Sequence, residues 1–254
     1  IGHEASSAAA GILSAQMDLA SPGPLFELCQ RSRRMYPRWV EHLQRRSGTG
    51  VAYAVDGILY LALTGHEERA KERQARWQRK RGLRIDRWSR REVLRREPEV
   101  DGRLKSAFHF PTEAQVDNVS LMQALAVACR KSDVDLREET GVRRVLVRER
   151  AVRGVETDAG ELKAPVVVNC LGSWASMGGR FPVALPVEPV RGQMLAFTGP
   201  RRLFRHVVMS ERAYVVQRRD GRLLVGSTLE HAGFEKVLTL DPDWRVPDLW
   251  RHEF

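Results

Sequence analysis

The chain has 254 residues, enough for a sizeable hydrophobic core and for two lobes. Its 43% hydrophobic and 29% charged residues are ordinary for a globular protein, and no apolar run approaches the roughly 20 residues needed to cross a bilayer. The net charge of +10 is concentrated between Arg69 and Arg96, where thirteen Lys and Arg stand against three acidic residues. This basic segment predicts either a solvated helical surface or a site for phosphate-rich partners.

The cysteines and histidines indicate neither a disulfide framework nor a metal site. Cys29, Cys129 and Cys170 are far apart and odd in number, and no C-x-x-C motif occurs. We therefore expect a reducing compartment and a cytoplasmic location. The seven histidines are scattered and include no H-x-x-x-H pair, so no metal site is expected.

The N-terminal part is predicted to contain closely approaching backbone, a helix and a hairpin. Residues 2–15 are rich in alanine, serine and glycine, which lets backbone approach a flat ligand, although a flexible terminus would have the same composition. The spacing of apolar residues predicts a helix over Leu25–Arg46, interrupted or kinked at Pro37. Two strands, Val51–Val55 and Ile58–Leu63, are expected to form a hairpin around the Asp-Gly turn between them.

The middle of the chain is predicted to alternate helices with strands. Two charged helices are expected over Glu67–Lys80 and Ser89–Glu97. A third, over Val119–Arg130, has Asp117 and Asn118 as candidate N-caps. The strands expected here are Ser106–Phe110, Asp133–Leu136 and the antiparallel pair Val142–Arg148 and Val152–Thr157.

The stretch from Val166 to Ala175 carries the strongest signal of a ligand site. A run of β-branched residues ends near Gly172, which is typical of a buried parallel strand that delivers a turn at its carboxyl end. Ligands of open α/β sheets bind at that end, although an ordinary core strand followed by a loop has the same pattern. We expect the backbone near Gly11 and Gly172 to meet across one sheet edge and form a floor for a planar ring.

The C-terminal part is predicted to be antiparallel. Its turn residues Arg219–Arg222 favour a hairpin. The strands expected are Gln193–Thr198, Val207–Met209, Tyr214–Gln217 and Leu223–Ser227.

No self-contained catalytic apparatus is visible in the sequence. The chain has no G-x-S-x-G elbow, no P-loop, no G-x-G-x-x-G motif and no acid–base pair recognisable from its spacing. A ligand-binding sheet without a nucleophile or a metal indicates that a cofactor carries the chemistry. No catalytic side chain is therefore predicted.

Five local sequences occur in the order found in one enzyme family. They are Glu4–Leu13, Gln115–Asp117, Val167–Trp174, Pro189–Gln193 and Tyr214–Thr228. Together they resemble the D-amino-acid-oxidase-type FAD-dependent oxidoreductases, and within that family most closely the bacterial glycine oxidases of thiamine biosynthesis. The resemblance extends from Gly2 to about Phe234 and fades beyond it.

The resemblance implies an α/β fold with two lobes. A truncated Rossmann-like FAD-binding lobe would comprise residues 1–46 and 111–178. An inserted antiparallel-sheet substrate lobe would comprise 47–110 and 179–240, followed by an irregular tail over 241–254. The implied activity is oxidative deamination of a small, glycine-like amino acid or amine, with FAD as cofactor and O2 as acceptor, in an enzyme capable of forming oligomers.

The resemblance also implies site residues. Tyr214 matches an aromatic residue of the substrate pocket, where its hydroxyl would meet the substrate carboxylate, with a half-buried strand tyrosine as the alternative. The resemblance implies that the FAD phosphates lie near Ala5, Ser6 and Ser7, and that the isoalloxazine ring lies beside Ala10, Gly11 and Ile12. It implies a contact on the adenine side from Val142. The implied turn close to the flavin consists of Cys170, Leu171, Gly172 and Trp174.

Some family features have no counterpart in the chain. The first strand with its Gly-rich phosphate turn and ribose-binding acid would precede Ile1, and the late arginine that clamps the substrate carboxylate is absent, as is the closing flavin-binding loop and helix. We therefore expect the chain alone to bind FAD weakly or not at all. Two alternatives stay open: a flavin oxidase acting on sarcosine or a tRNA-attached glycine derivative, and a non-catalytic nucleic-acid-binding module using Arg69–Arg96.

Overall fold

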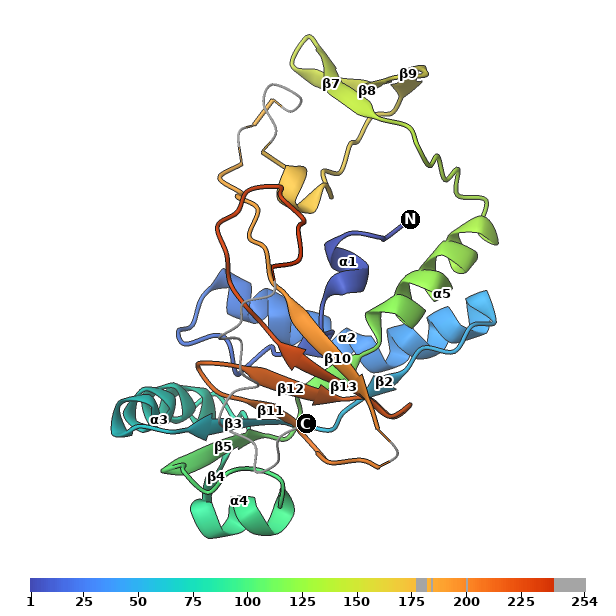
Figure 1. The fold of residues 1–254 in the computed structure, drawn as a ribbon. Coiled ribbons are helices and arrows are strands. Elements are labelled where there is room, and N and C mark those ends of the chain that lie inside the picture. Colours follow the sequence, from blue (N-terminus) through green and yellow to red (C-terminus); the bar gives the residue numbers. More distant parts are fainter. Residues whose placement is uncertain (177–181, 184, 200, 240–254) are drawn as a thin grey trace.

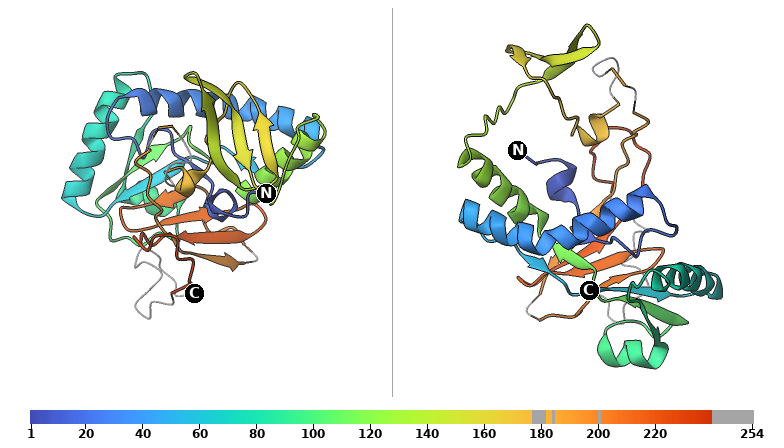
Figure 2. Two further views of the ribbon diagram at one scale, coloured as in Figure 1. Left: turned by 90° about the horizontal axis from the view of Figure 1, so that it is seen from above. Right: turned by 180° about the vertical axis from the view of Figure 1, so that it is seen from behind.

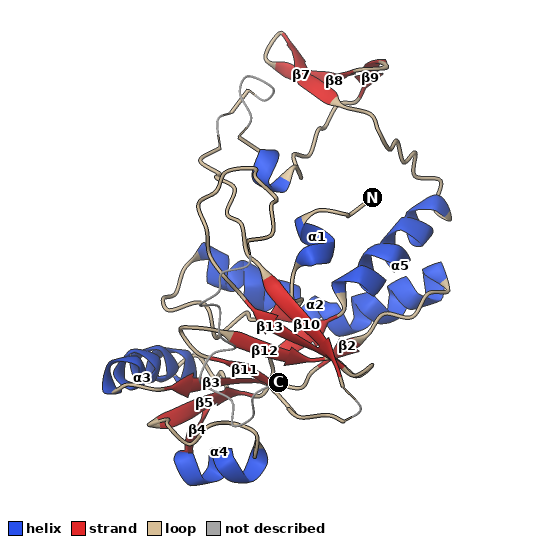
Figure 3. Ribbon diagram, in the orientation of Figure 1, coloured by secondary structure: helices blue, strands red, loops and turns tan. Residues whose placement is uncertain are grey.

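The computed structural model describes residues 1–176, 182–183, 185–199 and 201–239, which form three sheets with helices packed around two of them (Figures 1 and 3). The helices are α1 (Ala5–Ala8), α2 (Pro24–Ser47), α3 (Gly65–Arg79), α4 (Arg90–Arg96), α5 (Asn118–Arg130) and the 3-10 turn η1 (Gly172–Trp174). The strands are β1 (Ile12–Leu13), β2 (Tyr53–Ala54), β3 (Ile58–Ala62), β4 (Asp86–Ser89), β5 (Ser106–Phe110), β6 (Ala114–Val116), β7 (Val142–Arg148), β8 (Ala151–Thr157), β9 (Gly160–Lys163), β10 (Met194–Thr198), β11 (Val207–Met209), β12 (Tyr214–Gln217) and β13 (Arg222–Gly226).

A seven-stranded sheet in the order β10-β13-β12-β11-β3-β5-β4 is the centre of the fold. Its neighbouring strands are antiparallel except for β11 and β3, which are parallel, with Val208 opposite Leu59. The sheet therefore joins two segments that lie far apart in the sequence, 58–110 and 194–226. Helices α3 and α4 lie at the β3-β5-β4 side (Figure 1).

Both faces of this sheet are buried, and β3 shows why its sequence is continuously apolar. Alternate residues point to opposite faces of a strand. Leu59 and Leu61 belong to one hydrophobic cluster, and Ile58, Tyr60 and Ala62 belong to the other. All five are at most 3% exposed. Burying a Leu or Ile side chain contributes about 1.5–3 kcal/mol, so β3 contributes to the core on both of its faces.

A small sheet in the order β1-β6-β2 connects the large sheet with helices α2 and α5. Helix α5 begins where the Asp117 carboxylate accepts a hydrogen bond from the Ser120 backbone N–H. This bond satisfies one of the N–H groups that a helix N-terminus leaves unpaired. The cluster that packs α2 and α5 against the small sheet consists of Val40, Leu43, Val51, Val116, Leu121, Ala124 and Ala128.

The third sheet, β7-β8-β9, lies apart from the other two in Figure 1 and in the right-hand view of Figure 2. It is the predicted antiparallel meander with one further strand, and Val142 opens it. Leu146 of β7 is buried, whereas Val147 beside it is 45% exposed. Burial along the rest of β7 does not alternate strictly, and the pairing of β7 with β8 shifts register between Val142 and Arg144 and between Leu146 and Val147.

The predicted fold class, a mixed α/β chain with an antiparallel-sheet portion, is confirmed by this architecture. The two predicted charged helices form as α3 and α4, and the third predicted helix forms as α5, each within two residues of its expected bounds. The predicted strand Ser106–Phe110 and the four predicted C-terminal strands also form within two residues of their expected bounds. Helix α2 also forms and continues through Pro37, so an interruption there is wrong, while the alternative of a kink stays a prediction. The boundaries of the two lobes stay a prediction, and the tail 241–254 lies outside the described residues.

The predicted hairpin around Asp56-Gly57 is wrong. Strand β2 pairs with β6 in the small sheet, whereas β3 pairs with β5 and β11 in the large one. Gly57 has a φ of +78° and donates its N–H to the Glu113 carbonyl at 3.0 Å, and its own carbonyl accepts from the Val207 N–H at 3.1 Å. The left-handed glycine therefore passes the chain from one sheet to another instead of folding it back on itself.

Two predicted strands are absent from the described structure. Residues 166–171 of the stretch Val166–Ala175 form no strand and lead into η1, and Asp133–Leu136 is irregular. Val166 and Val168 are 71% and 75% exposed, so the expected burial is wrong as well. A strand needs a neighbour to pair its backbone N–H and C=O groups, and no described strand pairs with either segment.

Candidate functional site

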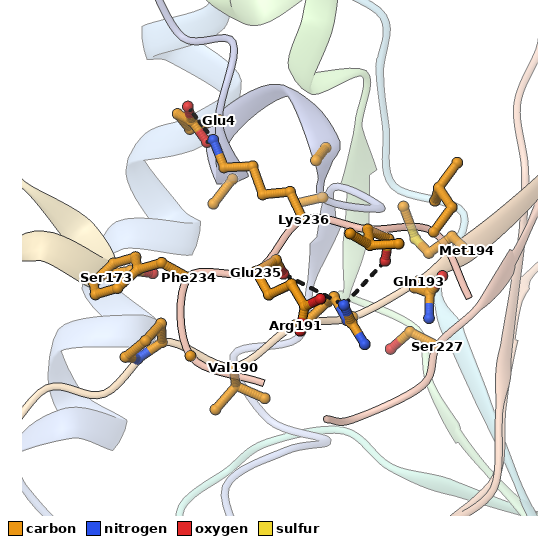
Figure 4. Close-up of a pocket in the computed structure, with 18 of the residues that line it drawn as sticks. Glu4, Ser173, Val190, Arg191, Gln193, Met194, Ser227, Phe234, Glu235 and Lys236 are labelled. Atoms are coloured by element: carbon orange, nitrogen blue, oxygen red, sulfur yellow. Dashed lines mark hydrogen bonds and ion pairs between the residues drawn. The ribbon is translucent and has the colours of Figure 1, made fainter. Parts of the chain in front are cut away.

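A pocket of about 590 Å³ lies where the N-terminal segment, η1, the start of β10 and the segment after β13 meet (Figure 4). It is a candidate ligand site because four parts of the chain, distant in sequence, converge there. Its lining residues are His3, Glu4, Ala5, Ala8, Ala9, Ser173, Trp174, Pro189, Val190, Arg191, Gly192, Gln193, Met194, Tyr214, Ser227, Gly233, Phe234, Glu235, Lys236, Val237 and Leu238.

The apolar walls of the pocket consist of small alanine side chains on one side and of aromatic rings on the other. Ala5, Ala8 and Ala9 come from α1 and the residue after it. The rings of Trp174 and Phe234 stack with centroids 5.3 Å apart and an interplanar angle of 26°. Flat aromatic faces and short alanine side chains leave room for a planar ligand.

A charged pair closes the pocket beside the aromatic stack. The Lys236 Nζ lies 2.6 Å from the Glu4 carboxylate and 5.6 Å from the centroid of the Trp174 ring (Figure 4). This pair ties the segment after β13 to the N-terminal segment. Because both side chains are largely exposed, the ion pair itself contributes little to stability, and it acts mainly on local geometry.

A polar network anchors the base of the pocket. The Arg191 guanidinium lies 2.5 Å from the Glu230 carboxylate and donates to the Val237 carbonyl at 3.0 Å. Glu230 also accepts from the Thr228 hydroxyl and the Gln193 amide, each at 2.6 Å. Hydrogen bonds from Thr228, Gln193 and Arg191, in that order of effect, lower the pKa of Glu230 to about 2. Glu230 is therefore ionised at neutral pH and holds its donors in place.

Tyr214 lines the pocket from β12, and its position depends on a glycine. Its hydroxyl lies 2.9 Å from the Met194 Sδ. Tyr214 is opposite Gly226 in the β12–β13 register, and a Cβ at residue 226 would lie 2.6 Å from the Tyr214 hydroxyl. That separation is shorter than real Cβ contacts, so the absence of a side chain at 226 makes the room in which the tyrosine ring lies.

The structure brings three of the residues implied by the family resemblance into one pocket: Ala5, Trp174 and Tyr214. The others do not line it. Ser6 and Ser7 belong to α1, Ala10, Gly11 and Ile12 connect α1 to β1, Val142 opens the separate meander, and Cys170, Leu171 and Gly172 precede Trp174. Their contacts with FAD stay predictions.

The expected floor of Gly11 and Gly172 is not what lines the pocket. Gly11 has a φ of +67° and packs against β6, where an added Cβ would lie 2.0 Å from the Val116 carbonyl oxygen. Gly172 has a φ of +53°, and a Cβ added to it would meet no atom within 4 Å. The pocket is lined instead by Ala9, two residues before Gly11, and by Ser173, the residue after Gly172.

FAD fits this pocket in part. The alanines of α1 and the Trp174–Phe234 stack offer flat apolar walls to a planar ring system, and these are the residues that would hold it. A cradle of backbone N–H groups for a diphosphate, of the Gly-x-Gly-x-x-Gly kind, is absent from the sequence. Within the described residues, no group of three or more His, Cys, Asp or Glu side chains is placed to hold a metal ion.

The sequence did not predict the polar network around Arg191 and Glu230. Pro189–Gln193 is part of the family resemblance, but its sequence alone assigns no role to Arg191. Arg191 meets Glu230 across 39 residues, and the backbone of the two segments pairs through reciprocal N–H···O bonds of 2.9 Å. Neither residue belongs to a motif with fixed spacing, so only the folded chain shows the pair.

The basic segment Arg69–Arg96 is partly neutralised by the fold. Its arginines 79, 81, 84 and 87 form ion pairs with Glu72, Glu27, Asp86 and Glu68 respectively. Lys71 is half-buried and donates to the Met17 carbonyl, and burial lowers its pKa to about 8. The excess of positive charge seen in the sequence is thus interrupted on the folded surface.

No helix among the described residues is long and apolar enough to span a membrane.

The chain is similar to several proteins of known name. It is 31% identical to the bifunctional protein ThiO/ThiG of Synechocystis sp., over 97% of this chain and 38% of that protein. It is 30% identical to the glycine oxidase of Geobacillus kaustophilus, over 93% of this chain and 63% of that protein. The chain therefore spans less than two thirds of the length of these relatives.

The fold matches solved structures over most of the chain. The crystal structure of glycine oxidase from Geobacillus kaustophilus superposes with a TM-score of 0.89 at 30% identity, covering 94% of this chain and 65% of that one. L-proline dehydrogenase from P. horikoshii, at 22% identity and a TM-score of 0.76, shares the fold. The family model for FAD-dependent oxidoreductases (DAO) matches residues 1–252. The chain belongs to the DAO family of FAD-dependent oxidoreductases.

Proposed function

We propose that this protein acts in the FAD-dependent oxidation of a small amino acid, with glycine as the first candidate and O2 as electron acceptor. The observation that carries the proposal is the pocket in which Ala5, Trp174 and Tyr214 meet. Relatives named glycine oxidase and ThiO/ThiG support the choice of substrate. We also propose a reducing compartment such as the cytoplasm, since the three cysteines form no disulfide in the structure.

The volume and walls of the pocket favour a small substrate beside a planar cofactor. FAD, when bound, accepts two electrons from the carbon–nitrogen bond of the substrate. A planar ligand lying against the alanines and the Trp174–Phe234 stack would displace water from these apolar surfaces. Exclusion of water strengthens each polar contact that the substrate makes there.

Tyr214 is the residue assigned to the substrate carboxylate. Among the described residues, its hydroxyl contacts only the weak thioether acceptor of Met194, at 2.9 Å, so it is available to donate to a stronger, charged acceptor. The cations of the pocket are already committed: Arg191 to Glu230 and Lys236 to Glu4. Among the described lining residues, Tyr214 is therefore the best donor for this carboxylate.

Glu230 does not serve as the base in this proposal. Its carboxylate accepts from three donors, and its pKa of about 2 means that it holds no proton at neutral pH and has little affinity for one. Its part is to hold Arg191, which in turn fixes the segment around Val237 that covers the pocket. The protein contributes binding and orientation of the substrate rather than acid–base chemistry.

The test is reduction of flavin by candidate substrates. Because weak FAD retention is expected, FAD is supplied in excess, and the bound fraction is measured by equilibrium dialysis. Glycine, sarcosine and D-alanine are added without oxygen while flavin absorbance is followed, and O2 consumption is measured separately. We expect glycine to bleach the bound flavin. Bound flavin that stays oxidised with all three substrates refutes the proposal.

A matched pair of variants tests the assigned donor. Tyr214→Phe removes the hydroxyl and is expected to raise the KM for glycine at least tenfold, since a hydrogen bond to a charged group contributes about 1.5–3 kcal/mol. Tyr36→Phe removes a hydroxyl from α2, outside the pocket, and is expected to leave KM unchanged. Equal KM values for Tyr214→Phe and the unsubstituted protein would show that the tyrosine does not bind the carboxylate.

A further inference from the structure

A second hollow, of about 810 Å³, lies near α4 and shares no lining residue with the pocket described above. It is formed by the loop between β2 and β3, the last turn of α4 and the loop before β11. We call it the arginine hollow, and its lining residues are Val55, Asp56, Arg95, Arg96, Arg202, Arg205 and His206.

A buried carboxylate holds one wall of the arginine hollow in place. Glu97 is fully buried and accepts from the backbone N–H groups of Arg205 at 3.1 Å and His206 at 3.0 Å, and from the His206 Nδ1 at 2.5 Å. The loop is closed from its other side by Arg202, which donates to the carbonyls of Phe204 and Arg205 at 2.9 and 2.7 Å. The loop that carries these cations is thus fixed before any ligand arrives, which lowers the entropic cost of binding.

The cations of the hollow outnumber its carboxylates. Asp56 is the one carboxylate in the lining, and it already faces Arg202 at 3.3 Å and Arg219 at 3.7 Å. Arg95, Arg96 and Arg205 take part in no ion pair among the described residues, and the Arg96 guanidinium lies over the Trp88 ring at 4.3 Å. The hollow therefore gathers guanidinium groups that form no ion pair among the described residues, with Glu92, one turn earlier on α4, as a carboxylate that interacts electrostatically with Arg95 and Arg96.

The geometry points to a small phosphate-bearing molecule as the ligand of the arginine hollow. Phosphate offers three acceptor oxygens and close to two negative charges, which suits several guanidinium forks better than a single carboxylate does. A long nucleic acid fits less well, because carboxylates neutralise part of the basic surface of α3 and β4, as Glu72 pairs with Arg79 at 3.1 Å and Glu68 pairs with Arg87. The hollow brings Arg95, Arg96 and Arg205 to one place, whereas Arg73 and Arg76, which also form no ion pair among the described residues, lie on the exposed face of α3 outside it.

Titration of the whole protein with inorganic diphosphate in a calorimeter at low ionic strength tests this inference. We expect one site per chain, with an affinity that falls as salt is added. The double variant Arg95→Gln/Arg205→Gln is expected to weaken diphosphate binding at least tenfold, since each lost charge-assisted contact is stronger than a neutral hydrogen bond. The control Arg73→Gln/Arg76→Gln removes the same charge from exposed positions on α3 and is expected to change affinity less than threefold.

Three results would overturn the inference. The first is no binding of millimolar diphosphate to the unsubstituted protein. The second is equal weakening by the hollow and α3 variants, which would indicate a diffuse electrostatic effect of net charge. The third is a single-stranded RNA that binds more tightly than diphosphate, is not displaced by diphosphate, and binds the Arg95→Gln/Arg205→Gln variant as tightly as the unsubstituted protein. Unfolding curves of both double variants check that each is folded, so a loss of binding is not a loss of structure.

Discussion

Glu113 gives the sharpest prediction about the folded chain, because it is a buried carboxyl group with incomplete pairing. It is fully buried, and its Oε2 accepts from the Gln16 backbone N–H at 3.1 Å. Its Oε1 has no hydrogen-bond partner, and the nearest cation, the Arg33 Nη1, is 3.6 Å away. Burial is the largest cause that raises the pKa of Glu113, to about 7 from its ordinary 4.5. The proposed perturbation is Glu113→Gln, which keeps the shape and removes the ionisation.

The sign of the effect follows from proton linkage. Because the pKa is higher in the folded state, the folded protein binds this proton more tightly than the unfolded chain does. The stability that Glu113 contributes is therefore complete below pH 4.5 and is lost as pH rises through about 7. At 1.36 kcal/mol for each pKa unit, the loss is about 3 kcal/mol. Glutamine does not titrate, so the variant escapes this loss.

The assay compares unfolding free energies of the two proteins by urea denaturation at pH 5, 6, 7 and 8. Other titrating groups are common to both and cancel in the difference. We expect the difference to shift by about 2.5 kcal/mol in favour of Glu113→Gln between pH 5 and pH 8, somewhat less than the full loss because the unfolded chain has already released most of this proton at pH 5. Glu41→Gln, at an exposed position paired with Arg45, is the control and should show no such shift. A difference independent of pH would mean that Glu113 is ionised beside Arg33 in the folded protein, and would refute the reasoning.

Three further substitutions test the packing and capping described above, each by urea denaturation. Phe108→Ala empties a fully buried position between the β3 and β4 neighbours and is expected to cost about 3–5 kcal/mol; a loss below about 1 kcal/mol would contradict its place in the core. Gly226→Ala forces the Tyr214 ring aside and is expected to cost about 1–3 kcal/mol, whereas Gly226→Ala in a Tyr214→Ala background should cost less. Ser89→Ala removes the capping box with Glu92 at α4 and should cost about 1 kcal/mol, with Ser176→Ala, outside any helix, as control.

Features set by neighbouring residues were predictable from the sequence. The helix over Asn118–Arg130 begins where Asp117 meets the Ser120 N–H, a contact that spans three residues. The turn at Arg219–Arg222 joins β12 to β13 as expected, because Asp220 accepts from the Arg222 backbone within the turn itself. The chemistry of such elements is complete within a few residues, so the local sequence specifies them.

Features set by distant partners were not predictable in the same way. The Asp56-Gly57 pair has the composition of a hairpin turn, but β3 finds better partners in β5 and β11, which bury it on both faces. The candidate site shows the same limit. Tyr214 and Trp174 follow from the family resemblance, whereas the Arg191–Glu230 pair and the arginine hollow depend on contacts across 39 and more than 100 residues. Long-range pairing of this kind leaves no spacing in the sequence.

The run Val166–Val168 shows most directly that strand propensity needs a partner to be realised. β-Branched residues favour strands because they pack on a pleated, half-buried surface. Val166 and Val168 are 71% and 75% exposed and no described strand pairs with them, so that packing is missing. We therefore predict that Val166→Ser/Val168→Ser changes the unfolding free energy of this chain by less than about 0.5 kcal/mol, as exposed substitutions do. The matched pair Val207→Ser/Val216→Ser, at fully buried positions of β11 and β12, should abolish cooperative unfolding or cost several kcal/mol. A loss above about 2 kcal/mol for the first pair would show that residues 166–168 are buried against a neighbour in solution, and that the original strand assignment holds there.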